Sequence, residues 1–164
     1  MSADFPGETG VNPITISYLA DFPEHHPQVT DWLWQAFGNA QSRAFFDSIV
    51  VSSLKKSGLP VTFIARDGDR LVGTVGLWRS DLLSRQDLTP WLAALYVDEA
   101  YRGRGIGQLL QAHGVEVARQ ARFEALYLYA TFRGYYERHG WEVMGEGVEY
   151  PDIGVWVYGR GLEP

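Results

Sequence analysis

Apolar residues recur along the chain with two different periods, which predicts a domain of mixed strands and helices. Short apolar runs bounded by turn residues are typical of strands, and a spacing of three to four positions is typical of amphipathic helices. The expected strands cover residues 14–20, 61–65, 70–78, 91–97 and 125–130, with two more around 141–144 and 154–158. The expected helices cover residues 29–37 and 42–56, one that begins at Ile106, and a short one over 133–139.

The third of these helices follows a strand and a glycine-rich loop. Residues 91–97 carry no charge, and the loop reads Arg102-Gly103-Arg104-Gly105-Ile106-Gly107. One face of the helix is expected to hold Ile106, Leu109, Leu110, His113 and Val117. Glycine lets the backbone approach an anion closely, and the N–H groups of a first helical turn bind phosphate oxygens. The pattern therefore predicts a pyrophosphate-binding loop.

Two better-known phosphate loops do not fit this spacing. A Walker loop needs Gly-Lys followed by Ser or Thr, whereas Gly107 is followed by Gln108 and Leu109. A dinucleotide fingerprint needs a third glycine where Gln108 stands. The remaining pattern, Arg-x-x-Gly-x-Gly, resembles the coenzyme A pyrophosphate loop of the GNAT superfamily of acyl-CoA-dependent N-acetyltransferases.

A second segment, residues 134–141, reads Gly-Tyr-Tyr-Glu-Arg-His-Gly-Trp and resembles the aromatic-Tyr-Glu-Arg/Lys-x-Gly-aromatic segment of the same family. The resemblance implies that Tyr136 lies near the coenzyme sulfur and donates a proton to the departing thiolate. A tyrosine with a pKa near ~10 is protonated at neutral pH, so this role is chemically reasonable. From the residues alone, Tyr135 and Tyr136 could also be ordinary packing aromatics.

The resemblance carries expectations for the whole chain. It implies an α+β fold with α/β/α layers, in which about seven strands form a mixed sheet with splayed central parallel strands and four helices. Residues 13–164 would form this single domain, and residues 1–12 a flexible arm. The amide of Val97 would hold the oxyanion of the attacked thioester. The residues expected to bind acetyl-CoA are Leu95, Tyr96, Val97, Arg102, Gly103, Arg104, Gly105, Ile106, Gly107, Thr131 and Tyr136.

Composition narrows the chemistry and the cellular setting. The chain has 164 residues, 46% of them hydrophobic and 21% charged, and no cysteine. Disulfides, thiolate metal sites and an acyl-cysteine intermediate are thereby excluded. No Lys or Arg precedes Arg43, and no apolar run approaches the ~20 residues of a membrane span. We therefore expect a cytoplasmic protein without membrane partners.

The distribution of charge says more than its total of −6. Residues 1–42 contain five acidic residues and no Lys or Arg. Nucleic-acid binding is disfavoured, because affinity for phosphate backbones comes mainly from clustered Lys and Arg. A small cationic acceptor is mildly favoured, although solvated surface carboxylates explain the same composition.

The base that would deprotonate an acceptor amine is not identified by the sequence. Family members often carry a carboxylate on the central strand, but residues 91–97 contain none. Glu24, Glu149 and Asp152 are candidates by their place in the chain alone. The acidic and aromatic residues expected beside the acceptor are Glu24, Trp34, Trp91 and Glu149. No metal is expected, because the adjacent His25 and His26 lack the spacing of a helical metal site.

The leading hypothesis is an N-acetyltransferase that moves the acetyl group of acetyl-CoA directly to a primary amine of a small molecule or peptide. The reaction would take place in a ternary complex, without an acyl-enzyme. One alternative is a non-catalytic acyl-CoA sensor, which the lack of a recognisable base favours. Another is an acetyltransferase acting on charged tRNA, against which the acidic N-terminal segment argues. A homodimer is an expectation from the family alone.

Overall fold

A single seven-stranded sheet organises the fold, which is given by a computed structural model that describes residues 13–38 and 42–163. The predicted arm over residues 1–12 lies outside these residues. The strand order across the sheet is β1-β2-β3-β4-β5-β7-β6. The strands are β1 (Ile14–Tyr18), β2 (Val61–Asp67), β3 (Arg70–Trp78), β4 (Trp91–Val97), β5 (Ala125–Ala130), β6 (Glu142–Glu149) and β7 (Ile153–Gly161).

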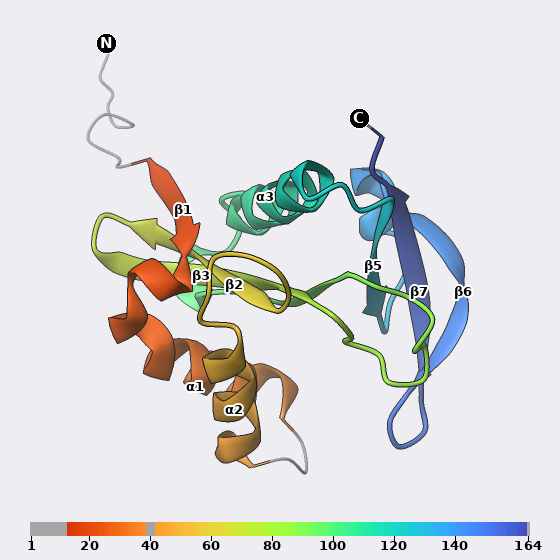
Figure 1. Cartoon of the computed structure of the whole chain (residues 1–164), viewed down its shortest axis with the longest axis horizontal. Coiled ribbons are helices and arrows are strands. Elements are labelled where there is room, and N and C mark those ends of the chain that lie inside the picture. The colour runs from red at the N-terminus through yellow and green to blue at the C-terminus, as the bar shows by residue number, and fades with distance from the viewer. Residues whose placement is uncertain (1–12, 39–41, 164) are drawn as a thin grey trace.

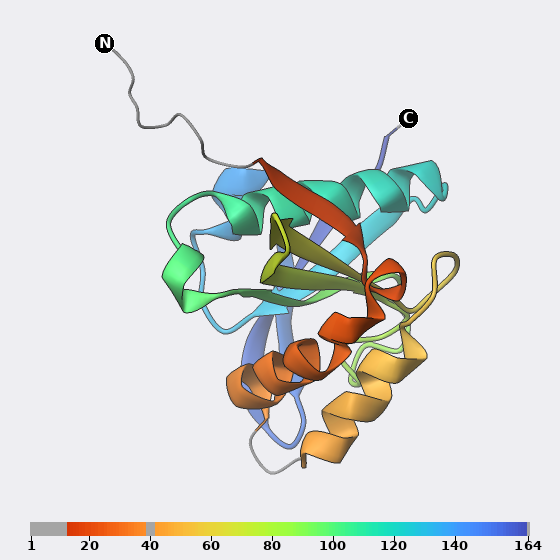
Figure 2. The same cartoon turned by 90° about the vertical axis from the view of Figure 1, so that its left-hand side faces the viewer.

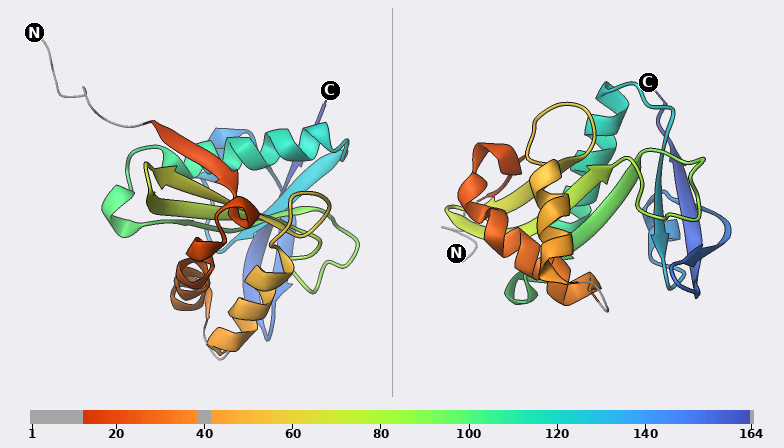
Figure 3. Two further views of the ribbon diagram at one scale, coloured as in Figure 1. Left: turned by 60° about the vertical axis from the view of Figure 1, so that its left-hand side comes forward. Right: turned by 60° about the horizontal axis from the view of Figure 1, so that its bottom comes forward.

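All neighbouring strands are antiparallel except β4 and β5, which are parallel at the centre of the sheet. A parallel pair needs a crossover connection, and here α3 (Ile106–Gln120) provides it. The mixed sheet predicted from the sequence is confirmed. Figure 3 shows β5, β7 and β6 set apart from the other half of the sheet.

Helices cover both faces of the sheet and make three layers. The helix α3 packs on one face, mainly against β3 and β4 (Figures 1 and 2). The other face is covered by α1 (His26–Phe37) and α2 (Arg43–Ser52), which also pack against each other. The predicted α/β/α arrangement is thus present, since each face of the sheet is apolar and must be buried.

Three apolar clusters lie between these layers. Under α3, the largest cluster includes Leu92, Leu110 and Leu126. Under α1 and α2, a second cluster is built around Val29, Leu33, Phe46 and Ile64. A third cluster lies on the β5–β7 half of the sheet, and it consists of Leu82, Trp91, Val155 and Val157 with Leu88, Tyr127 and Tyr129 at its edge.

The fourth predicted helix is only a 3-10 turn, over Tyr136–His139. Gly134 and Gly140 flank it with φ values of 105° and 92°. These left-handed residues end helical geometry on both sides and leave room for a single turn. The described part of the chain therefore has three α-helices, and the predicted count of four was wrong.

The buried face of α3 also differs from the expected one. Leu109 is 47% exposed, whereas Ile106, Leu110, Gly114 and Ala118 are buried. A Cβ built on Gly114 would lie 2.5 Å from Cδ1 of Leu92 in β4. At this glycine the helix packs closely against the sheet. With Gly114 facing β4, the helix is rotated about its axis so that Leu109 faces solvent.

Candidate acyl-CoA site

The two central parallel strands separate soon after they begin. Only Trp91 of β4 and Tyr127 of β5 form a bridge pair, and the N–H of Tyr127 donates to the carbonyl of Pro90 over 3.1 Å. The first three residues of β4 are buried, whereas the last four, residues 94–97, are half-buried. The carboxyl-terminal half of β4 is therefore uncovered on its β5 side, at the edge of an α/β sheet where ligands bind.

A β-bulge interrupts β4 where the gap opens. One residue of β3, Val75, separates the partners of Ala93 and Tyr96, whereas Ala94 and Leu95 separate these two on β4. Ala94 has a φ of 54°, which is uncommon for a residue other than glycine. An extra residue in one strand bends that strand and re-aims its backbone. This bulge was not predicted from the sequence, because an alanine carries no turn signal.

The glycine-rich loop links β4 to α3. Gly103 and Gly105 both have a φ of 81°, in the left-handed region that favours glycine. Gly105 is the residue before the helix, and the N–H of Leu109 donates to its carbonyl over 3.1 Å. Ile106 is buried and anchors the first turn. The N–H groups of that turn therefore point out of the helix end, where they can bind an anion.

A cavity of about 440 Å³ joins this loop to the open half of β4. Eight of the predicted coenzyme-binding residues line it: Leu95, Tyr96, Val97, Arg102, Gly103, Gly105, Ile106 and Gly107. Tyr101, Gln108 and Tyr135 line it as well and were not predicted. The predicted residues Arg104, Thr131 and Tyr136 are not among its lining. The structure thus brings the loop and the strand end together in one concave surface.

The two arginines of the loop have different surroundings. Nε of Arg102 donates to the carbonyl of Val97 over 2.9 Å, and its guanidinium lies 5.2 Å from the ring centre of Tyr96. Arg102 therefore ties the loop to the end of β4. The guanidinium of Arg104 is exposed and lies 4.6 Å from the ring centre of Tyr101. Both arginines are exposed, and Arg104 differs in that its guanidinium is not tied to the end of β4.

Tyr136 stands in a group of aromatic rings. Its ring stacks on Phe132 with 5.9 Å between centres and meets Tyr135 edge-on at 4.9 Å. Trp141 and Tyr158 complete the group. Burial, with smaller contributions from the charges of Tyr135 and Tyr158, raises the pKa of Tyr136 to about 12. The hydroxyl stays protonated across the physiological range, as a proton donor must.

Glu137 holds this segment in place. Its carboxylate accepts hydrogen bonds from Nε of Arg133 at 2.8 Å, the N–H of Gly134 at 2.7 Å and the hydroxyl of Tyr158 at 3.0 Å. The Arg133 guanidinium first, and then the backbone and Tyr158 donors, lower the pKa of Glu137 to about 2. One carboxylate therefore connects the 3-10 turn to β7.

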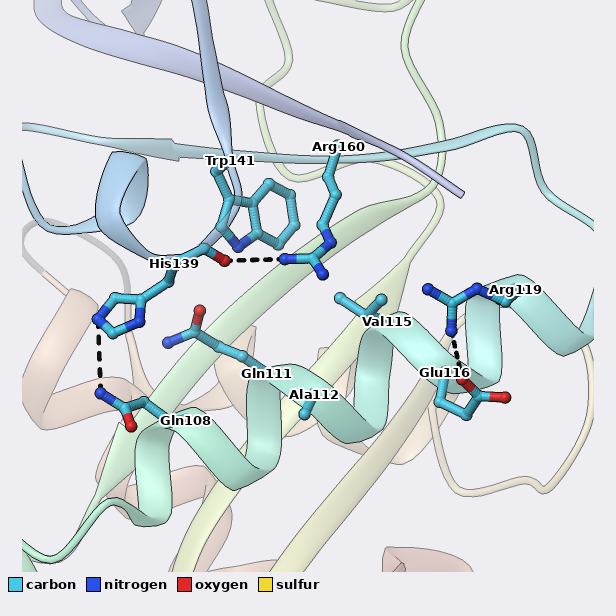
Figure 4. Close-up of a pocket in the computed structure, with 9 residues that line it drawn as sticks. All are labelled: Gln108, Gln111, Ala112, Val115, Glu116, Arg119, His139, Trp141 and Arg160. Atoms are coloured by element: carbon cyan, nitrogen blue, oxygen red, sulfur yellow. Dashed lines mark hydrogen bonds and ion pairs between the residues drawn. The ribbon is translucent and has the colours of Figure 1, made fainter. Parts of the chain in front are cut away.

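A second concavity, of about 370 Å³, runs between α3 and the segment after β5 (Figure 4). His139 and Gln108 face each other across it, with 3.4 Å between the two Nε2 atoms. Arg160 donates to the carbonyl of His139 over 2.8 Å. Because Gln108 lines both concavities, the second one adjoins the cavity at the glycine loop. It is lined by Gln108, Gln111, Ala112, Val115, Glu116, Arg119, His139, Trp141 and Arg160.

The predicted acceptor residues are distributed over two parts of the molecule. Trp91 is fully buried, and its ring lies 6.4 Å from that of Tyr129, whose hydroxyl donates to Glu149 over 2.9 Å. Glu24 and Trp34 belong to the helical layer instead, where both are exposed. The structure thus links Trp91 with Glu149 through Tyr129 and places Glu24 and Trp34 in the helical layer.

No three His, Cys, Asp or Glu side chains within residues 13–38 and 42–163 are grouped so that they could hold a metal ion. In the same ranges, no helix has the length and apolar character that a membrane span requires.

A family model described as "Acetyltransferase (GNAT) family" matches residues 26–141, well over half of the chain. The chain belongs to the GNAT acetyltransferase family. The family resemblance noted from the sequence is thereby confirmed. No curated protein matches the sequence.

Solved structures share the fold of this GNAT protein at low sequence identity. A putative GNAT acetyltransferase from Desulfovibrio desulfuricans aligns with a TM-score of 0.73 at 13% identity, covering 92% of this chain and 100% of that one. An aminoglycoside 6'-N-acetyltransferase complexed with coenzyme A gives 0.72 at 16%, covering 92% and 98%. IAA acetyltransferase from Bacillus cereus gives 0.65 at 17%, covering 92% and 100%. At these identities the likeness shows the fold.

The glycine positions yield a matched pair of variants. Gly105→Ala should lower stability by about 1–2 kcal/mol, because alanine is strained in the left-handed region. Gly107→Ala should leave stability unchanged or slightly higher, since its Cβ would contact only Cγ2 of Val97 at an ordinary 3.8 Å. Urea denaturation measures both. Equal losses for the two variants would contradict the assigned backbone conformations.

The hydrogen bonds of Glu137 predict an acid-dependent loss of stability. The pKa of Glu137 falls from 4.5 to about 2 on folding. Its carboxylate therefore stabilises the folded protein fully at pH values above 4.5, and this stabilisation is lost as the pH falls toward about 2. Glu137→Gln should therefore flatten the decline of unfolding free energy between these pH values. The control is Glu116→Gln, which removes an exposed ion pair with Arg119. Parallel curves for wild type and Glu137→Gln would refute the prediction.

Proposed function

We propose that the protein is an N-acetyltransferase that transfers the acetyl group of acetyl-CoA to a primary amine of a small molecule or peptide. The observation that supports this most is the single cavity that joins the glycine loop to the uncovered half of β4. A pyrophosphate on the glycine loop, with a thioester arm along residues 95–97, would occupy both parts of this cavity. The name of the aminoglycoside 6'-N-acetyltransferase among the similar folds supports an amine as acceptor.

The loop would bind the coenzyme mainly through backbone. The N–H groups at the start of α3, and the positive end of the helix dipole, favour the pyrophosphate. Arg104 adds an exposed positive charge beside them. The acyl-pantetheine arm would follow residues 95–97, where the backbone of β4 is not covered by β5. The amide of Val97 would then hold the oxygen of the thioester carbonyl.

The chemistry we propose is direct attack in a ternary complex. The neutral amine attacks the thioester carbonyl carbon, and the carbonyl π electrons move to oxygen. The resulting tetrahedral adduct collapses, so that the C–S bond breaks and an amide forms. Tyr136 gives its proton to the thiolate, and its phenolate recovers a proton from the nitrogen of the adduct. The chain has no cysteine that could carry the acetyl group in a competing two-step route.

Two measurements test the function as a whole. Calorimetry should detect acetyl-CoA binding, and a panel of amines should give thiol release with a mass increase of one acetyl group in the acceptor. If acetyl-CoA binds but none of the amines gives thiol release, a non-catalytic acyl-CoA sensor would be favoured. Salt-sensitive binding of tRNA would favour an acetyltransferase of charged tRNA. Absence of acetyl-CoA binding would contradict the proposal.

A charge reversal in the loop tests coenzyme binding. Arg104→Glu should weaken acetyl-CoA binding at least 10-fold, because it sets a carboxylate against the pyrophosphate. Its effect on thermal unfolding should be small, since the Arg104 side chain is exposed. The control is Arg79→Glu, an equally exposed reversal just after β3. Equal weakening by both variants would indicate a general charge effect and contradict the assigned role.

The adjacent tyrosines provide a comparison for the proton donor. Tyr136→Phe should lower kcat about 100-fold, within the usual range for loss of a general acid. Tyr135→Phe removes a hydroxyl that accepts a hydrogen bond from Gln111, and its effect should be much smaller. Stopped thiol-release assays with saturating acetyl-CoA measure both. A larger loss for Tyr135→Phe would assign the proton to Tyr135, which lines the cavity.

A further inference from the structure

Three polar side chains from distant parts of the chain meet on the β5–β7 half of the sheet. Asp81 lies in the segment between β3 and β4, Tyr129 in β5 and Glu149 at the end of β6. The hydroxyl of Tyr129 donates to Glu149 over 2.9 Å, the charge of Glu149 raises the pKa of Asp81, and the charge of Asp81 raises the pKa of Tyr129. We call these three residues the carboxylate cluster. Figure 1 shows the segment after β3 extending toward β5 and β7.

Packing holds the Asp81 segment in position. Leu82, the next residue, is buried against Trp91, Val155 and Val157. Oγ of Ser84 donates to the carbonyl of Val148 in β6 over 2.6 Å. The segment that carries Asp81 is thus held near Tyr129 and Glu149 by the apolar contacts of Leu82 and the hydrogen bond of Ser84.

The carboxylate cluster lies beside the gap between β4 and β5. Tyr129 is two residues beyond Tyr127, the bridge partner of Trp91, so it points to the same face as Trp91. Two residues beyond Trp91 on β4 stands Ala93, where the bulge begins. The cluster and the bulge therefore lie on opposite sides of the gap at the same level. Leu126 and Leu128 point to the α3 face instead.

The carboxylate cluster contains two acids and no partner cation. No hydrogen bond or ion pair to the Asp81 carboxylate is found within residues 13–38 and 42–163. Asp81 is half-buried, and its partial removal from solvent first, then the charge of Glu149, raises its pKa to about 7. From β5 the titratable neighbours are Tyr127 and Tyr129, and the nearby Arg85 is paired with Asp87. From β4 and β7 the side chains of Trp91, Val155 and Val157 pack in this region, and none of them titrates.

A second polar group, on the β3–β4 part of the same sheet face, also lacks a partner. Nε1 of Trp78, at the end of β3, is buried and makes no hydrogen bond within the described part of the chain. Its indole lies over Gly76, which pairs with Ala93 of the bulge. Buried donors are rarely left unpaired in folded proteins.

We propose that Asp81 is the general base of the reaction, and that the carboxylate cluster binds the ammonium group of a cationic acceptor on the face of the gap opposite α3. This inference rests on the proposed acetyl transfer and names the residue that sequence reasoning left unidentified. Asp81 accepts a proton from the ammonium nitrogen and leaves a lone pair on that nitrogen. The neutral amine then attacks the thioester carbon, and the proton on Asp81 leaves to solvent after the product departs.

The first test compares Asp81→Asn with Asp87→Asn, an exposed acid of the same segment. With an alkyl amine, whose pKa is about 10, Asp81→Asn should lower kcat/KM about 100-fold or more, and Asp87→Asn should have little effect. With an aromatic amine, which is already neutral at pH 7, the loss should be much smaller. A residue that only supported the fold would lower both activities equally.

The pH profile gives a second readout. In wild type, kcat/KM should rise as the pH passes through about 7, because Asp81 must be ionised to act as a base. This rise should be absent from Asp81→Asn. Glu149→Gln should move it to lower pH, because the charge of Glu149 raises the pKa of Asp81. An unchanged profile in Asp81→Asn would overturn the assignment.

Stability separates a catalytic role from a structural one. An acid whose pKa is raised on folding destabilises the folded state as the pH rises through the folded value. Asp81→Asn should therefore unfold at a higher temperature than wild type at pH 8, with a smaller difference at pH 5. A lower unfolding temperature at pH 8 would indicate a structural role.

The outcomes distinguish the proposed function from the role of Asp81. If wild type acetylates no amine, the proposed function fails, and the assignment of Asp81 fails with it. If wild type acetylates an amine and Asp81→Asn keeps the full rate, only the assignment of Asp81 fails.

Discussion

The parallel pair at the centre of the sheet is the constraint on which the rest of the structure depends. The strands β4 and β5 pair only at their first residues, so one half of a central strand loses the hydrogen-bonding neighbour that a sheet normally provides. Uncovered backbone at the middle of a domain is unfavourable unless water or a ligand satisfies it. The gap is therefore both a weakness of the sheet and the place where an extended thioester arm can pair with protein backbone.

Other elements compensate for this weakness from both sides. On one side, Arg102 ties the glycine loop back to Val97, and α3 packs tightly on β4 at Gly114. On the other, every residue of β5 pairs with β7, and Glu137 anchors the turn after β5 to β7 through Tyr158. Each half of the sheet thus has packing and hydrogen bonds of its own next to the gap.

The proposed reaction uses the two faces of the gap differently. The α3 face offers backbone donors and the exposed Arg104 to an anionic coenzyme. The other face offers Asp81 and Glu149 to a cationic acceptor. This separation of charge keeps the two substrates in their own positions and brings their reacting atoms together only where the strands diverge. The elevated pKa of Asp81 has a cost in stability, which is common where a group serves chemistry.

Local sequence determined much of this protein. Period and turn residues located the strands and α-helices, and the glycine loop and Tyr136 segment identified the family, because these signals depend on neighbouring residues. What required the tertiary structure depends on distant ones. The 3-10 turn after β5, the bulge at Ala94 and the rotation of α3 that exposes Leu109 follow from packing against other elements. Asp81 looked like any loop carboxylate until β5 and β6 were folded against it, since its surroundings come from residues about 50 to 70 positions away in the chain.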